Sequence, residues 1–92
     1  MNYGYRIIGY KKVSFTGKDN KVIEGYRFYF AKSLLYESSV VFGFVDPFDK
    51  FVFSNREELL SKLFGFYSCQ SLVHLLYNER GSFIDVKEAD DF

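Results

Sequence analysis

The sequence is poor in several residue types: its 92 residues include one cysteine, one histidine, one proline and no tryptophan. Because Cys69 is the only thiol, an internal disulfide and a four-thiolate zinc site are excluded, and His74 adds one ligand at most. A disulfide-stapled secreted module is therefore excluded. No run approaches the roughly 20 apolar residues of a membrane-spanning helix, and the first residues lack a signal-segment pattern. These absences predict a protein of a reducing cytoplasm.

Net charge is also absent, because 12 basic side chains balance 12 acidic ones. This balance argues against a general polyanion binder, yet the charges are unevenly distributed. Residues 1–36 carry seven basic and two acidic side chains, whereas residues 37–92 carry five and ten. The gradient indicates a basic surface in the first half and an acidic C-terminal end.

Aromatic residues are abundant, since eight Tyr and twelve Phe make up 22% of the chain. Hydrophobic residues reach 48%, which excludes a disordered chain on composition. The length allows one domain. A chain this short buries only about 60–65% of its unfolded surface, so its aromatic rings have to build the core efficiently.

Hydrophobic patterning predicts five strands. They are expected at residues 5–15, 22–32, 40–45 with a continuation at 51–53, 71–77 and 82–86. The polar segment 16–21 joins the first two strands into a hairpin. A turn is expected at 46–49, because Pro47 suits its second position. Neither alternate set of residues in the first strand is purely apolar, so a bulge or bend is expected near Gly9.

One short helix of about ten residues is expected after the third strand. Ser54 or Asn55 would cap its first turn, and Glu57 or Glu58 would complete a capping box. Gly65 lies where a left-handed helix terminator is common. The apolar stripe of the helix consists of Leu59, Leu60, Leu63 and Phe64.

The predicted fold is mostly β with one short helix, in the order β-β-β-α-β-β. A single flat sheet would leave one face exposed to water. Both alternate sets of strand residues carry aromatics, however, so a flat sheet would expose many of them. A closed, five-stranded OB-like barrel gives the inner face a core and removes most exposed edges. In this oligonucleotide-binding (OB) arrangement, the middle strands and the loops after strands one and four meet the ligand. Residues 1–87 would form the barrel, and 88–92 an acidic tip.

The first hairpin carries a family resemblance. Residues 8–18 (IGYKKVSFTGK), with VIEG at 22–25 and then Tyr29, resemble the first hairpin of small OB-fold proteins of phages, plasmids and integrative elements of Gram-positive bacteria. Those proteins are similar to the filamentous-phage single-stranded-DNA-binding proteins. Their closing hairpin is similar to residues 73–86 here, centred on the turn at 77–81. The resemblance implies single-stranded-DNA binding in phage or mobile-element replication.

The last five residues carry a second resemblance. Glu88-Ala89-Asp90-Asp91-Phe92 resembles the tips of bacterial and phage single-stranded-DNA-binding proteins, which dock replication and repair partners. A terminal Phe ring can enter an apolar pocket while the carboxylates meet a basic rim. The resemblance therefore implies that Asp90, Asp91 and Phe92 bind replication or repair proteins.

Aromatic and basic residues alternate in the first half of the chain, a pattern typical of surfaces that bind single strands. Each base stacked on a ring contributes about 1–3 kcal/mol, and cations pair with phosphates. If Phe28 points inwards, strand alternation places Arg27 and Tyr29 outwards, with Tyr10 and Lys12 beside them on the neighbouring strand. The expected core phenylalanines are Phe28, Phe30, Phe42 and Phe44.

The loops complete the predicted interface. Lys18 and Lys21 lie on the first loop and Arg80 on the last turn, while Tyr77 either stacks on a base or belongs to the core. The predicted nucleic-acid-binding residues are Tyr10, Lys12, Lys18, Lys21, Arg27, Tyr29, Tyr77 and Arg80. We expect no cofactor and no metal site. A homodimer would lengthen the binding track.

Two other functions compete with this hypothesis. Cys69 and His74 could form a nucleophile–base pair, but no motif positions the third, orienting group that catalysis needs, so no enzymatic activity is expected. Asp46, Asp49 and Glu57 could form a cation site, but their spacing matches no calcium loop, and it is typical of turn and cap residues. The main alternative is a small β domain that binds another protein and has no affinity for nucleic acid, which the zero net charge and abundant Phe favour.

Overall fold

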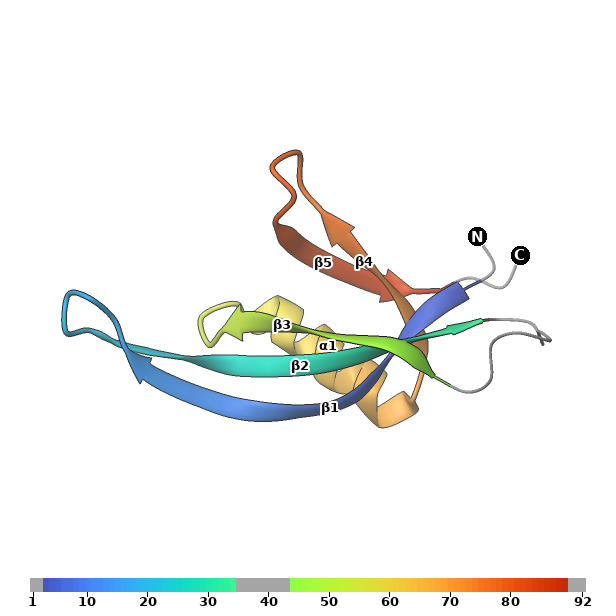
Figure 1. The fold of residues 1–92 in the computed structure, drawn as a ribbon, viewed down its shortest axis with the longest axis horizontal. Helices are drawn as coiled ribbons and strands as arrows, with labels where there is room; N and C mark the ends of the chain where they lie inside the picture. The colour runs from blue at the N-terminus through green and yellow to red at the C-terminus, as the bar shows by residue number, and fades with distance from the viewer. Residues whose placement is uncertain (1–2, 35–43, 90–92) are drawn as a thin grey trace.

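A computed structural model describes residues 3–34 and 44–89, and these residues form five strands and one helix. The elements in chain order are β1 (Tyr3–Thr16), β2 (Val22–Leu34), β3 (Val45–Phe53), α1 (Glu57–Cys69), β4 (Leu72–Tyr77) and β5 (Phe83–Glu88) (Figure 1). The predicted class and the order of the elements along the chain are confirmed. The described residues contain no helix that is long and apolar enough to cross a membrane.

The five strands form a single antiparallel sheet in the order β3-β2-β1-β4-β5. The strand order across the sheet therefore differs from the β-β-β-α-β-β order that the sequence predicts. β3 and β5 are the two edges, and they do not pair with each other within the described part of the chain. The sheet is thus open, and the closed barrel is not confirmed.

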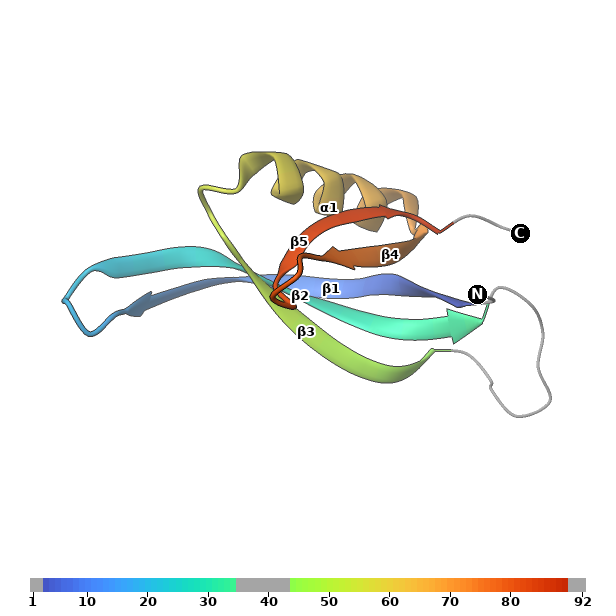
Figure 2. The same ribbon diagram turned by 90° about the horizontal axis from the view of Figure 1, so that it is seen from above.

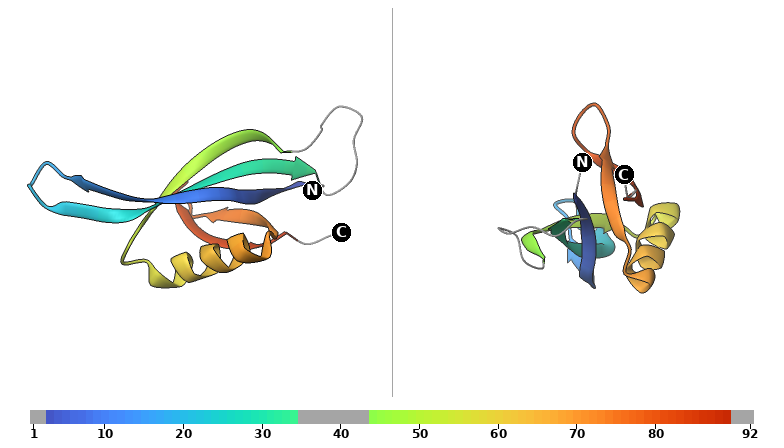
Figure 3. Two further views of the ribbon diagram at one scale, coloured as in Figure 1. Left: turned by 90° about the horizontal axis from the view of Figure 1, so that it is seen from below. Right: turned by 90° about the vertical axis from the view of Figure 1, so that its right-hand side faces the viewer.

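The sheet bends at the junction of β1 and β4. These strands pair only at Tyr5 with Val73 and at Arg6 with Leu72, whereas β1 and β2 pair from Tyr3 to Thr16. The β4–β5 hairpin therefore turns away from the layer of β1, β2 and β3 (Figures 1 and 3). Residues 14–24 of the β1–β2 hairpin extend beyond the last β2–β3 pair, at Gly25. We call this segment the hairpin arm; it lengthens the molecule to 50 Å.

The core lies between one face of the sheet and α1, which packs against β1 and β5 (Figure 2). Burying a Leu, Val or Phe side chain stabilises a fold by about 1.5–3 kcal/mol. Phe28 and Phe30 are fully buried, as predicted, whereas the prediction for Phe44 is wrong because its side chain is 45% exposed. Phe42 lies outside the described residues. The buried core consists of Ile7, Phe28, Phe30, Val52, Leu59, Leu60, Leu63, Val73 and Val86.

The helix is longer than the sequence predicts. Its N-cap is Arg56, no side chain caps its first turn, and Gly65 lies in its interior. The helix ends instead at Gln70, which adopts a left-handed conformation with φ 57°. A helical glycine costs roughly 1 kcal/mol. Packing of Phe66 against the core offsets this cost and carries the helix past Gly65.

The predicted turn at 46–49 is also wrong, because these residues belong to β3. Phe48 lies opposite Phe30, and their rings stack with centroids 5.2 Å apart. The register shifts beyond this pair, where Asp46 has φ 53°. Pro47 is therefore accommodated at an irregularity on an edge strand, where its missing N–H costs no ladder bond. Residues 40–43 of the predicted third strand lie outside the described residues.

Candidate nucleic-acid interface

The register of β1 against β2 decides which side chains share a face. It shifts between Ile7 and Gly9, which confirms the bulge predicted near Gly9. Beyond the shift, Tyr10 lies opposite Phe28 and Lys11 opposite Arg27. Directly opposed residues of antiparallel strands point to the same side of the sheet. Tyr10 thus shares the core-facing side with Phe28, and Lys11 shares the other side with Arg27.

Tyr10 and Lys12 therefore do not lie beside Arg27 and Tyr29, and that prediction is wrong. The ring of Tyr10 packs under α1, with centroids 5.1 Å from Phe64 and 5.2 Å from Tyr67. Lys12 lies opposite Tyr26 on the same side. The cause is the extra residue at the bulge, which exchanges the two faces of β1 for every residue after it.

The side of the sheet away from α1 carries a set of rings and cations, which we call the outer patch. β3 extends it, because Phe51 lies opposite Arg27, and Phe53 lies opposite Gly25. The patch consists of Lys11, Phe15, Arg27, Tyr29, Phe51 and Phe53. Arg27 and Tyr29 are predicted site residues that the structure brings together.

The rings and cations of the outer patch touch one another. The Lys11 ammonium lies 5.9 Å from the centre of the Tyr29 ring, and the Arg27 guanidinium 6.0 Å from that of Phe51. The Phe51 ring lies 5.9 Å from Phe15 and 5.0 Å, edge to face, from Phe53. Phe15 and Phe53 remain 46% and 49% exposed. The result is a row of accessible rings flanked by two cations, within the range of cation–π attraction.

Asp49 is the acidic neighbour of this patch. It lies opposite Tyr29 on β3, and its carboxylate accepts a hydrogen bond from the Arg27 guanidinium. Both side chains are more than one-third exposed. The pair is therefore a surface ion pair of small net stability.

The hairpin arm ends in the two predicted lysines, Lys18 and Lys21. Its turn is closed by the Gly17 N–H, which donates to the Lys21 carbonyl, and Asn20 has φ 62°. Lys18 and Lys21 are exposed, and the Lys21 ammonium is 4.0 Å from the Asp19 carboxylate. The arm thus carries these two lysines at its tip, and Phe15 of the outer patch lies at its base.

Tyr77 and Arg80 are not brought to the outer patch. The Tyr77 ring lies 5.2 Å from the Lys50 ammonium, and Lys50 lies opposite Phe28, on the core-facing side of β3. Arg80 is exposed in the β4–β5 turn, whose backbone is held by the Asn78 side chain. The predicted tip residues Asp90, Asp91 and Phe92 lie outside the described residues.

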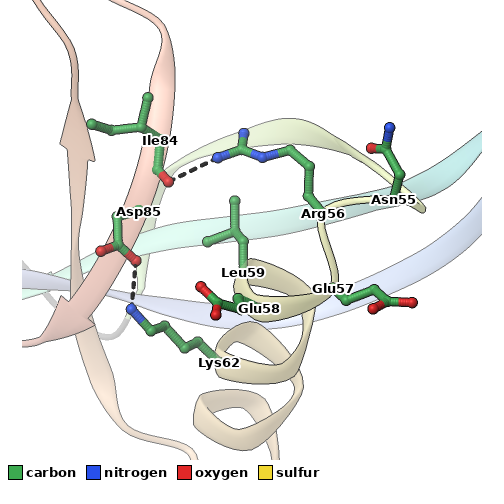
Figure 4. A pocket seen from close by; sticks show the side chains of 8 residues that line it. All are labelled: Asn55, Arg56, Glu57, Glu58, Leu59, Lys62, Ile84 and Asp85. Atoms are coloured by element: carbon green, nitrogen blue, oxygen red, sulfur yellow. Dashed lines mark hydrogen bonds and ion pairs between the residues drawn. The ribbon is translucent and has the colours of Figure 1, made fainter.

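A second polar cluster joins the start of α1 to β5 and lines an open pocket (Figure 4). Arg56 donates hydrogen bonds to the carbonyls of Phe83 and Ile84, at 3.1 and 2.8 Å. Lys62 donates to Asp85 at 2.9 Å. This hydrogen bond, with a second from the Val86 N–H, holds the pKa of Asp85 below its ordinary value of 3.8. These hydrogen bonds attach the start of the helix to the edge strand of the sheet.

The residues considered for catalysis and for a metal site include Cys69 and acidic residues of β3 and α1. Cys69 is a free, exposed thiol at the end of α1. Within residues 3–34 and 44–89, no group of three or more His, Cys, Asp or Glu side chains could hold a metal ion. Among the acidic residues Asp46, Asp49 and Glu57, Asp49 has its carboxylate paired with Arg27.

Comparison of the chain with protein-family models, with curated protein sequences and with solved structures found no match. The interface is therefore described by its geometry alone. Sequence reasoning missed Lys11, Phe15, Phe51 and Phe53. The available signal was the bulge near Gly9: counting one extra residue there would have placed Lys11 beside Arg27.

Proposed function

We propose that the chain binds single-stranded DNA without strong sequence preference, through the outer patch, in the replication of a phage or mobile element. The observation that carries the proposal is the contact of Lys11 with Tyr29 and of Arg27 with Phe51. Proteins that hold single strands combine rings for base stacking with cations for the phosphates. Every base has a stacking face, so such a surface tolerates any sequence.

We also propose that the open sheet is an OB-like barrel with one unpaired seam. β3 and β5 are the two free edges, and the OB fold is often only partly closed. The Lys50 ammonium of β3 lies 5.2 Å from the centre of the Tyr77 ring, at the end of β4, so the β4–β5 hairpin approaches the β3 edge. OB folds bind oligonucleotides on strands two and three and on the loop after strand one. The outer patch on β2 and β3, with the arm lysines, has this placement.

Fluorescence anisotropy with a labelled oligo-dT at low and moderate salt tests the proposal. Binding should weaken steeply as salt rises, because phosphate contacts release counterions. Absence of binding at tens of micromolar protein in low salt would refute DNA binding. A parallel titration with oligo-rU separates DNA from RNA preference.

Two adjacent lysines provide a matched pair of variants. Lys11→Ala removes a cation from the outer patch, and Lys12→Ala removes one from the opposite side of the same strand. Lys11→Ala should make the negative slope of log K against log salt shallower by about 0.7, the value for one phosphate contact on a single strand. Lys12→Ala should change it much less. Equal effects of the two variants would place the interface elsewhere.

Protein binding is the second candidate function, favoured by the exposure of Phe15 and Phe53. Exposed aromatic side chains are enriched in protein interfaces, and contiguous apolar surface often marks them. If this function holds, wild-type protein should retain a partner from cell extract that Phe53→Ser does not retain. Excess oligo-dT should not displace that partner. Displacement by oligo-dT would instead favour the DNA surface.

A further inference from the structure

Arg27 lies at the centre of the outer patch, beside the Phe51 ring and two charged side chains. Its guanidinium faces the Phe51 ring and pairs with Asp49 on β3. On its other side, β1 places Lys11 directly opposite. Like charges directly opposite each other destabilise a strand pair. The Asp49 carboxylate therefore neutralises one of two cations that the sheet forces together.

A carboxylate and a phosphate bind a guanidinium in the same way. Both offer acceptor oxygens that match the fork of Arg N–H donors. The Asp49 carboxylate thus stands where a phosphate oxygen would bind. The side chains of Arg27 and Asp49 are 37% and 40% exposed, so solvent and incoming anions have access to the pair.

We propose that Arg27 is a phosphate subsite for the bound strand, and that Asp49 lowers its affinity by occupying it in the free protein. This inference rests on the proposed binding of single-stranded DNA. It adds the group that receives a phosphate, the Arg27 guanidinium, and the group that competes with the phosphate, the Asp49 carboxylate. Asp49 is a positioning residue, acting on the strand through Arg27.

The opposite role for Asp49 would be to hold Arg27 in a binding conformation. The contact with Phe51 already restrains the guanidinium, because Arg stacks on aromatic faces. Asp49 adds a negative charge beside the position of the phosphate. Its removal should therefore strengthen binding, whereas loss of an orienting residue would weaken it.

Asp49→Asn tests the inference, because it keeps the size of the side chain and removes its charge. Affinity for oligo-dT at low salt should rise about two- to fivefold, the range of an exposed ion pair. The slope of log K against log salt should become steeper by up to about 0.7. Asp49→Ser serves as a second variant with the same expected direction. Thermal unfolding of each variant verifies that it is folded at the temperature of the titration.

Asp85→Asn is the matched control. It also removes an exposed carboxylate that pairs with a cation, but this carboxylate lies on β5, pairs with Lys62 of α1 and is not part of the outer patch. Both variants raise the net charge by one. If Asp85→Asn strengthens binding as much as Asp49→Asn does, general charge explains the effect and the inference is overturned.

A double-mutant cycle with Arg27→Ala assigns the effect to Arg27. Asp49→Asn should have little effect in the Arg27→Ala protein if Asp49 acts through the guanidinium. An undiminished effect, or weaker binding by Asp49→Asn alone, overturns the subsite. Failure of the proposed function looks different, because then neither wild type nor any variant binds oligo-dT, and the subsite falls with it.

Discussion

The Phe51 ring lies over Gly25 of the neighbouring strand and occupies the space that a side chain there would need. A Cβ atom at residue 25 would lie 2.6 Å from Cζ of Phe51 and would clash with the Val52 carbonyl oxygen. Phe51 in turn contacts Phe15, Phe53 and Arg27. A glycine at this position therefore allows the rings of the outer patch to lie close to the sheet.

Gly25→Ala should lower the free energy of unfolding by about 1–3 kcal/mol, the usual cost of overpacking. The backbone oxygen of Val52 cannot move away without disturbing the β2–β3 ladder. Urea unfolding followed by circular dichroism measures the loss. The same variant should weaken oligo-dT binding, because Phe51 has to leave its position. Unchanged stability would mean that Phe51 does not cover Gly25.

Gly65→Ala should have the opposite effect on stability. Gly65 is exposed within α1, and a Cβ there would meet nothing within 4 Å. Alanine in a helix interior is more stable than glycine by roughly 0.5–1 kcal/mol. The same urea titration should therefore show a higher midpoint. A lower midpoint would indicate that the helix ends at Gly65, as the sequence alone predicts.

The helix shows how much of the fold local sequence patterns can predict. The helical spacing of Leu59, Leu60 and Leu63 predicts α1 and its buried face correctly. The end of the helix depends on Phe66, whose contact with the core is a tertiary interaction. The tendency of glycine to end a helix is a local property and does not reveal that contact, so the predicted helix is too short.

The site was predicted less well, because one residue of register separates its two faces. Alternation around Phe28 places Arg27 and Tyr29 on the outer side correctly. Which residues of β1 share that side depends on the exact pairing across the bulge, which no local pattern supplies. The sequence therefore predicts the wrong side for Tyr10 and Lys12. It predicts Phe51 only as part of a short continuation of a strand, which does not reveal the place of Phe51 beside Arg27.

The Lys62–Asp85 pair should make stability depend on pH. Hydrogen bonds from Lys62 and the Val86 N–H lower the pKa of Asp85 in the folded state. A lowered pKa contributes stability above the unfolded pKa, and this contribution is lost as pH falls through the folded pKa. The difference in free energy of unfolding between wild type and Asp85→Asn should thus shrink below pH 3.8.

The size of this effect is limited by solvent, since both side chains are at least 40% exposed. We expect up to about 1 kcal/mol near neutral pH, the upper range for exposed pairs. Urea titrations of both proteins at several acidic and neutral pH values measure it. Lys62→Met should reduce the dependence in the same pH range. A difference that grows as pH falls would contradict the assignment.

Tyr10 and Tyr29 should behave in opposite ways if the register of β1 and β2 is as described. Tyr10 belongs to an aromatic cluster with Phe28, Phe64 and Tyr67. Tyr10→Ala should therefore cost about 1–3 kcal/mol of stability, less than full truncation of a buried ring because Tyr10 is 43% exposed. The affinity of the Tyr10→Ala protein for oligo-dT should be unchanged under conditions in which this variant is folded.

Tyr29→Ala should weaken oligo-dT binding by up to about tenfold, because one stacked base contributes about 1–3 kcal/mol and only part of it depends on this ring. Its cost in stability should be smaller than that of Tyr10→Ala, because Tyr29 faces away from the core. Anisotropy and urea unfolding of the two variants measure both quantities. The reverse assignment, with Tyr10 controlling binding and Tyr29 controlling stability, would require both β1 and β2 to turn their other faces to the core, since Tyr10 lies on β1 and Tyr29 on β2.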